Sequence, residues 1–108
     1  MKDQRGPAIR ALTERAGARR YWRHDHREPD ESAGLWYFEC VRDDDVWWCV
    51  RQIAPHPGGV SAYDGRHLED EHGFLTDQPI DEDEPLLVAI PAEEFEAEWR
   101  EAVQQRGP

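Results

Sequence analysis

The side chains best suited to acid–base or metal chemistry lie early in the chain, in His24-Asp25-His26, with Glu39 in the segment that follows. Residues i and i+2 share one face of a strand, so His24 and His26 could bind one ion together. An H-x-H pair alone is a weak metal pattern, and neither H-E-x-x-H nor a pair of C-x-x-C motifs accompanies it. The sequence therefore predicts no metal and no cofactor. Further histidines that could complete a site are His56, His67 and His72.

Carboxylates are the second group with chemical potential. Glu39 is surrounded by aromatic residues, where an unpaired charge would be costly, so we expect an ion pair with Arg51 or Arg42 rather than a catalytic acid. The acidic runs at 69–71 and 81–84 lack the glycine and the ligand spacing of a calcium loop. They are interpreted as solvated loops.

Aromatic side chains are concentrated in two segments, 35–42 and 46–53, which three aspartates separate. This pattern predicts a β-hairpin. Both alternating sets of side chains are substantially apolar, whereas a half-exposed sheet should alternate apolar and polar residues. We expect both faces to be mostly core, and the alternative is that one face presents its rings to a partner. The candidate binding residues are Trp36, Tyr37, Trp47, Trp48 and Arg51.

The two cysteines lie on opposite strands of this hairpin. A two-residue loop would pair Cys40 directly with Cys49, whereas a three-residue loop would pair Cys40 with Trp48. Two buried, reduced thiols are the favoured interpretation.

The remaining elements complete a small α+β fold. Residues 59–63 are predicted as a third strand and 86–90 as a short one, and Phe74, Leu75 and Ile80 are predicted anchors of the acidic loop at 66–85. A C-terminal helix is predicted at about 92–105, with Phe95, Trp99 and Val103 on one face. The predicted fold is a small antiparallel sheet built on the 35–42/46–53 hairpin and packed by this helix.

Charge divides the chain into two parts. Residues 1–20 are predicted to be a basic N-terminal appendage whose spacing allows a short helix, and 21–108 a single acidic α+β domain. Seven basic and two acidic side chains give residues 1–23 a net charge of +5, whereas six basic and 22 acidic ones leave −16 for the rest. A net charge of −16 on the residues after 23 should repel nucleic acid, and it favours a basic protein partner over a small molecule.

Several classes of protein are not indicated. The sequence has no apolar run of about 18 residues that would span a membrane, and its first twenty residues lack the apolar core of a secretory signal. Two cysteines are too few for a secreted disulfide scaffold. We therefore expect a cytoplasmic protein that does not bind membranes, and the sequence does not define an oligomeric state.

From Tyr21 to Ala102 the chain resembles a family of small bacterial domains of unknown function. The resemblance is carried by Trp22 with His24, by Val50-Arg51-Gln52-Ile53, by Gly73-Phe74-Leu75 with Pro79, and above all by the segment 90–99, IPAEEFEAEW. The chain departs from the family at Cys49, where the family has Glu, and at Pro91, where it has Ser or a similar cap. The resemblance implies an α+β fold with a terminal helix and no established activity, and some such domains look like immunity proteins of toxin systems.

Two functional hypotheses follow, beside a third in which the chain is a purely structural accessory domain whose acidic loops only confer solubility. The first is a small acidic interaction domain that binds a basic partner protein, either immunity- or antitoxin-like or as a pathway accessory. The alternative is a small enzyme or ligand- or metal-binding protein that uses His24, Asp25, His26 and Glu39 in a pocket beside the tryptophan-rich sheet.

Overall fold

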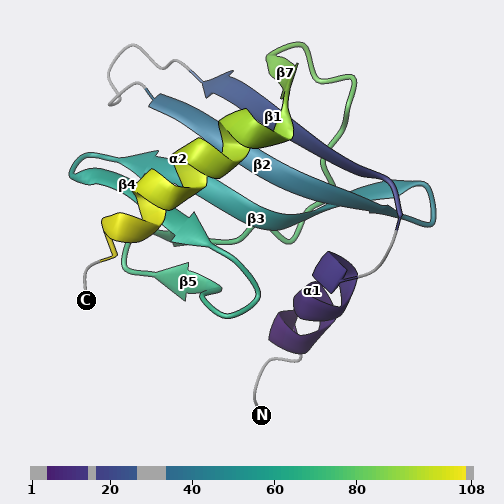
Figure 1. The fold of residues 1–108 in the computed structure, drawn as a ribbon, viewed down its shortest axis with the longest axis horizontal. Coiled ribbons are helices and arrows are strands. Elements are labelled where there is room, and N and C mark those ends of the chain that lie inside the picture. The colour runs from purple at the N-terminus through teal and green to yellow at the C-terminus, as the bar shows by residue number, and fades with distance from the viewer. Residues whose placement is uncertain (1–4, 15–16, 27–33, 107–108) are drawn as a thin grey trace.

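The computed structural model describes residues 5–14, 17–26 and 34–106. Its main sheet has five antiparallel strands in the order β4-β3-β2-β1-β7. The strands are β1 (Arg19–His26), β2 (Gly34–Asp43), β3 (Val46–His56), β4 (Gly59–Tyr63) and β7 (Leu87–Ile90). A two-stranded sheet, β5 (Glu69–Asp70) and β6 (Gly73–Phe74), and two helices, α1 (Arg5–Glu14) and α2 (Ala92–Gln104), complete the description (Figure 1). The predicted α+β fold with a C-terminal helix on an antiparallel sheet is confirmed.

The β2–β3 hairpin closes with a two-residue loop. Asp44 and Asp45 have φ values of 56° and 65°, the left-handed conformation of a type I′ turn, whose twist matches that of the strands. Cys40 therefore pairs directly with Cys49. Both are buried free thiols, and burial together with the neighbouring Cys40 raises the pKa of Cys49 well above its ordinary value. Glu39 pairs with Arg51, so one extra residue of β3 forms a bulge beside the cysteines.

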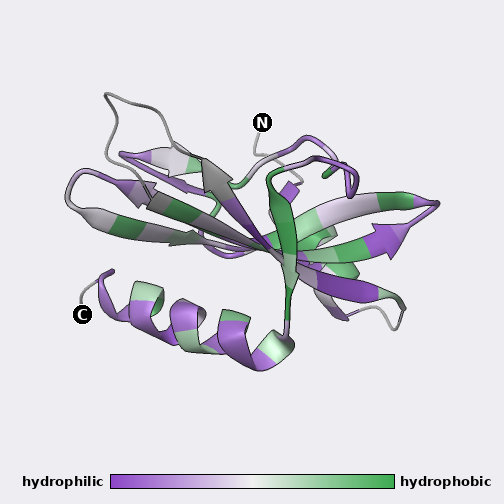
Figure 2. Ribbon diagram, turned by 90° about the horizontal axis from the view of Figure 1, so that it is seen from above, coloured by the Kyte–Doolittle hydropathy of each residue, from purple (hydrophilic) through white to green (hydrophobic). Residues whose placement is uncertain are grey.

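Both faces of the sheet are covered. Figure 1 shows α2 crossing one face, and Figure 2 shows the same helix lying along one side of the sheet. The core on this side contains Tyr37, Ile53, Ala62, Phe95 and Ala102. The core on the other side includes Trp22, Phe38, both cysteines, Trp47 and Tyr63. Ile9 of α1 and Leu75 of the segment between β4 and β7 complete it, so the sheet has no bare apolar face among the described residues.

The N-terminal helix packs against the rest of the chain. Ile9 is buried, Arg5 donates to the Leu75 carbonyl, and Arg10 donates to the Gly65 carbonyl at 2.9 Å. A Cβ at Gly6 would lie only 2.9 Å from that carbonyl oxygen, so glycine allows the close approach of the helix. Because β1 begins at Arg19, the predicted boundary at residue 20 lies within a strand.

One predicted anchor of the acidic loop is wrong. Phe74 is 57% exposed, whereas Leu75 is fully buried and Ile80 is partly buried against the second core. Successive residues of a strand point in opposite directions, so Leu75 takes the core position and turns Phe74 outward. Neither helix in the described part of the chain is long and apolar enough to cross a membrane.

Candidate functional site

The five aromatic and basic residues predicted to bind a partner do not lie together on one face of the sheet. Tyr37 is buried beneath α2 and Trp47 is buried on the other side, where its ring packs edge-on against Trp22 at 5.2 Å between centroids. Trp36 and Trp48 are half-buried. The indole nitrogen of Trp47 is buried without a hydrogen-bond partner among the described residues. Of the four aromatic residues, Tyr37 and Trp47 thus serve mainly in packing.

Arg51 and Glu39 form the centre of an ion-pair network beneath α2. Glu39 is only 4% exposed and accepts hydrogen bonds from Arg51, from Arg19 at 2.8 Å and from the Tyr21 hydroxyl at 3.3 Å. Arg51 also binds Glu96 of α2. Burial opposes the charge on Arg51, but its hydrogen bonds to Glu96 and Glu39 raise its pKa. The expected ion pair of Glu39 with Arg51 is therefore present.

The candidate acid–base residues are not brought together by the described structure. His24 pairs with Trp36 in the sheet and faces the side opposite α2, with its Nε2 3.4 Å from Glu84. Glu39 faces α2. The backbones of Asp25 and His26 lie at the end of β1, and their side chains lie outside the described residues. The predicted acid–base group therefore has its two described members on opposite faces.

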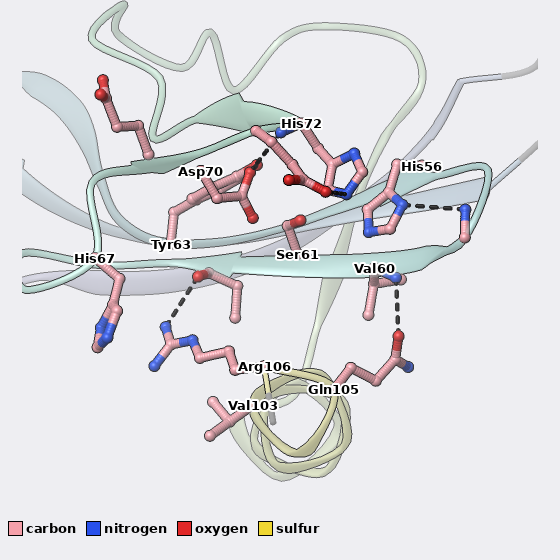
Figure 3. A pocket seen from close by; sticks show the side chains of 14 residues that line it. His56, Val60, Ser61, Tyr63, His67, Asp70, His72, Val103, Gln105 and Arg106 are labelled. Atoms are coloured by element: carbon pink, nitrogen blue, oxygen red, sulfur yellow. Dashed lines mark hydrogen bonds and ion pairs between the residues drawn. The ribbon is translucent and has the colours of Figure 1, made fainter. Parts of the chain in front are cut away.

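A groove of about 720 Å³ runs along β4, between the end of α2 and the β5–β6 hairpin. Figure 3 shows Val103, Gln105 and Arg106 on one side of β4, with Asp70 and His72 on the other. We call this the edge groove. Sequence reasoning did not find it, because its residues come from three separate segments, 56–63, 67–72 and 103–106.

The polar centre of the edge groove is Tyr63 with Asp70. The buried Tyr63 hydroxyl donates to Asp70 at 2.7 Å, and the backbone N–H groups of His72 and Gly73 donate to the same carboxylate oxygen. Burial alone would raise the pKa of Asp70, but these hydrogen bonds and one from Ser61 lower it to about 2. Burial and the bond to Asp70 raise the pKa of Tyr63 to about 12. The sequence of residues 70–73, D-E-H-G, is typical of an Asx turn, so this part of the site has a local sequence signal.

Replacing Tyr63 with phenylalanine should raise the pKa of Asp70 from about 2 towards its ordinary 3.8, because one donor to the charged form is lost. The pKa of Asp70 is lower in the folded protein than in the unfolded chain, so its ionised form stabilises the fold at pH values above the unfolded pKa. This contribution is lost as the pH falls from about 4 to about 2. An NMR titration of the Asp70 carboxyl carbon measures the shift. Tyr37→Phe is the control, since Tyr37 lies beneath α2. An unchanged Asp70 titration in Tyr63→Phe would contradict the assignment.

Two imidazole rings close the outer end of this groove. His56 and His72 stack with 3.6 Å between their centroids and 5° between their planes. The Gly58 N–H donates to His56 Nδ1 at 3.1 Å, and His72 Nε2 lies 3.3 Å from Glu71. In the described part of the chain, no three His, Cys, Asp or Glu side chains are grouped to hold a metal ion. The stack therefore joins the β3–β4 turn to the β5–β6 hairpin without forming a chelate.

A second cavity, of about 330 Å³, adjoins the edge groove and shares Tyr63 and His72 with it. It lies on the sheet face opposite α2 and is lined mainly by rings and small residues. We call it the aromatic cavity. Its lining residues are Trp36, Gln52, Ala54, Pro55, Tyr63, His72, Gly73, Phe74 and Thr76.

Carboxylates surround the strand at the other end of the sheet. The residues 81–84 precede β7, Glu93 and Glu94 follow it, and we call this set with β7 the acidic edge. Glu82 lies 3.6 Å from Arg20, and Glu94 lies 3.7 Å from Arg23. Six carboxylates at this edge thus face two arginines, which leaves an excess of negative charge.

Comparison with protein-family models, with curated proteins and with solved structures gives no match. The resemblance to small uncharacterised bacterial domains therefore stays a prediction.

Proposed function

We propose that this chain is a small interaction domain that binds a basic protein partner at the acidic edge, as an immunity-like protein or a pathway accessory. The observation that carries the proposal is an open strand edge bordered by carboxylates. Among the described residues β7 pairs with β1 alone and is the last strand of the sheet. An unpaired edge presents backbone donors and acceptors to an incoming strand.

The opposite edge of the sheet differs, which supports this choice. The Val60 N–H donates to the Gln105 side chain at 3.1 Å, and Arg106 donates to the Ala62 carbonyl at 2.9 Å. Side chains at the end of α2 therefore satisfy backbone groups along β4. The β7 edge instead carries exposed apolar side chains, with Leu86 49% and Val88 42% exposed.

Charge selects among the partners that could use this edge. The chain has a net charge of −11, so a second copy would be repelled, whereas a basic segment would be attracted. Several arginines among the described residues already pair with carboxylates of the chain, as Arg19, Arg51 and Arg106 illustrate. The six carboxylates of the acidic edge outnumber the two arginines that pair with them, and this excess of negative charge supports a cationic partner.

Reversing two exposed charges at this edge should weaken capture of basic proteins at least about tenfold, since rim charges steer association. The variant is Asp83→Lys with Glu93→Lys, and the assay is a quantitative pull-down from a cell lysate followed by reconstitution with the purified partner. Raising the salt from roughly 0.1 M to roughly 1 M shortens the Debye length from about 10 to about 3 Å and should release the partner.

The matched control is Glu69→Lys with Glu71→Lys, which changes the net charge equally but lies at the β5–β6 hairpin. This variant should retain the partner. Equal loss in both double variants would show that overall charge, and not the acidic edge, attracts basic proteins. Binding that does not respond to salt would contradict the proposed function itself.

A further inference from the structure

The aromatic cavity is formed by one small residue between large ones. On the face opposite α2, Phe38, Gln52 and Tyr63 form one row across β2, β3 and β4. In the neighbouring row Ala54 pairs with Ser61, and Trp36 lies on β2 two residues before Phe38. The short side chain of Ala54 leaves a hollow whose sides are Trp36 and Tyr63.

The roof of the cavity is fixed to the sheet by a buried amide. Gln52 Nε2 donates to the Phe74 carbonyl at 3.3 Å, and the Thr76 N–H donates to Gln52 Oε1 at 2.8 Å. Gln52 is only 3% exposed, so these bonds form away from water and are costly to break. The segment that carries Phe74 is thereby held over the hollow. Backbone and side-chain hydrogen bonds therefore fix the shape of the cavity, which does not depend on the rotamer of a single side chain.

The indole, phenol and phenyl rings of Trp36, Tyr63 and Phe74 line this cavity together with the imidazole of His72. Phe74 is more than half exposed, so its ring is available at the rim. The electron-rich face of an aromatic ring attracts cations, most strongly where water is excluded. No lysine or arginine is among the described residues of the lining, so an anion would find no permanently charged partner there.

The surroundings of the cavity are negative. Tyr63, which lines it, donates to the ionised Asp70, and Glu71 lies beside the lining residue His72. A cation at the rim would therefore be attracted both by the rings and by these carboxylates. The volume of about 330 Å³ is at the small end of the usual range for ligand pockets, about 300–1,000 Å³.

We infer that the aromatic cavity binds a small organic cation of the quaternary ammonium class. The methyl groups of such an ion fill an apolar hollow while its charge faces the rings. A hydroxyl group carried by such an ion would reach the edge groove, where Asp70 and Ser61 lie. None of the acidic-edge residues line the cavity, so this binding is independent of the proposed partner.

Choline is the probe, and 3,3-dimethyl-1-butanol is its neutral isostere. Titration of the full chain, followed through the tryptophan indole N–H signals in NMR spectra, should give saturable shifts for Trp36 with choline. The isostere should bind at least about tenfold more weakly, because it keeps the shape and loses the charge. Sodium chloride at matched ionic strength controls for screening.

Variants locate the site. Phe74→Leu retains an apolar side chain at an exposed position, so it should fold normally and weaken choline binding at least about fivefold. Leu86→Ala, at an exposed apolar residue outside the cavity, should leave the affinity unchanged. Three results would overturn the inference: no saturable shift up to about 10 mM choline, equal affinity for the neutral isostere, or an unchanged affinity in Phe74→Leu.

Discussion

Replacing Glu39 with glutamine should lower the free energy of unfolding by about 3 kcal/mol, near the lower end of the range for breaking a buried ion pair. Glu39 is 4% exposed, and its carboxylate forms ion pairs with both Arg19 and Arg51. Glutamine keeps the volume but removes the charge, so two arginines beneath α2 lose their shared counter-ion. Glu96 still pairs with Arg51, which limits the loss. Urea denaturation followed by tryptophan fluorescence measures the change.

Glu96→Gln is the matched control for this substitution. It removes a carboxylate from the same arginine, but the Glu96 side chain is 40% exposed, and exposed ion pairs contribute at most about 1 kcal/mol. We therefore expect a change within about 1 kcal/mol for Glu96→Gln. Equal effects of the two substitutions would show that the burial of Glu39 does not determine the strength of the network.

The parts of the fold that depend on local sequence were predictable. The hairpin follows from two aromatic segments around three aspartates, and the two-residue loop fixes the pairing of Cys40 with Cys49. The terminal helix follows from the spacing of Phe95, Trp99 and Val103. In each case the structure is determined by a short repeat in the spacing of apolar residues or by a single type of turn.

The cover of the second sheet face was not predictable in the same way. It comes from α1 and from the irregular segment between β4 and β7, which contribute Ile9, Leu68 and Leu75 singly. Isolated apolar residues in an acidic, turn-rich segment carry no period, so their contact with the sheet depends on tertiary packing. The apolar character of both hairpin faces did predict that such a cover exists.

The two hollows beside β4 depend on the same long-range contacts. Gln52 reaches residues more than twenty positions away, and the stacked rings of His56 and His72 join two separate turns. Sequence spacing indicates the Asx turn at Asp70 but not which strand it will meet. Trp36 of the β2–β3 hairpin lines the aromatic cavity, but the sequence pattern of the hairpin does not predict that this cavity exists.

Replacing Phe95 with alanine should lower the free energy of unfolding by about 3–5 kcal/mol, as is usual for removing a fully buried ring. Phe95 is 0% exposed and joins α2 to the sheet through Tyr21 of β1, at 5.4 Å between ring centroids, and it also stacks on Trp99 of its own helix at 6.1 Å. The Arg51 guanidinium also lies 5.0 Å from its centroid, so the substitution removes a cation–π contact from the ion-pair network. Chemical denaturation gives the change directly.

Phe74→Ala is the matched control, because it removes the same ring from a position that is 57% exposed. Its expected effect on stability is within about 0.5 kcal/mol, as for most surface substitutions. The two phenylalanines therefore separate the roles of the two sheet faces: Phe95 holds the helix onto the sheet, whereas Phe74 lines the aromatic cavity. A large loss of stability in Phe74→Ala, or a small one in Phe95→Ala, would contradict this division, because ring burial would then not determine which phenylalanine supports the fold.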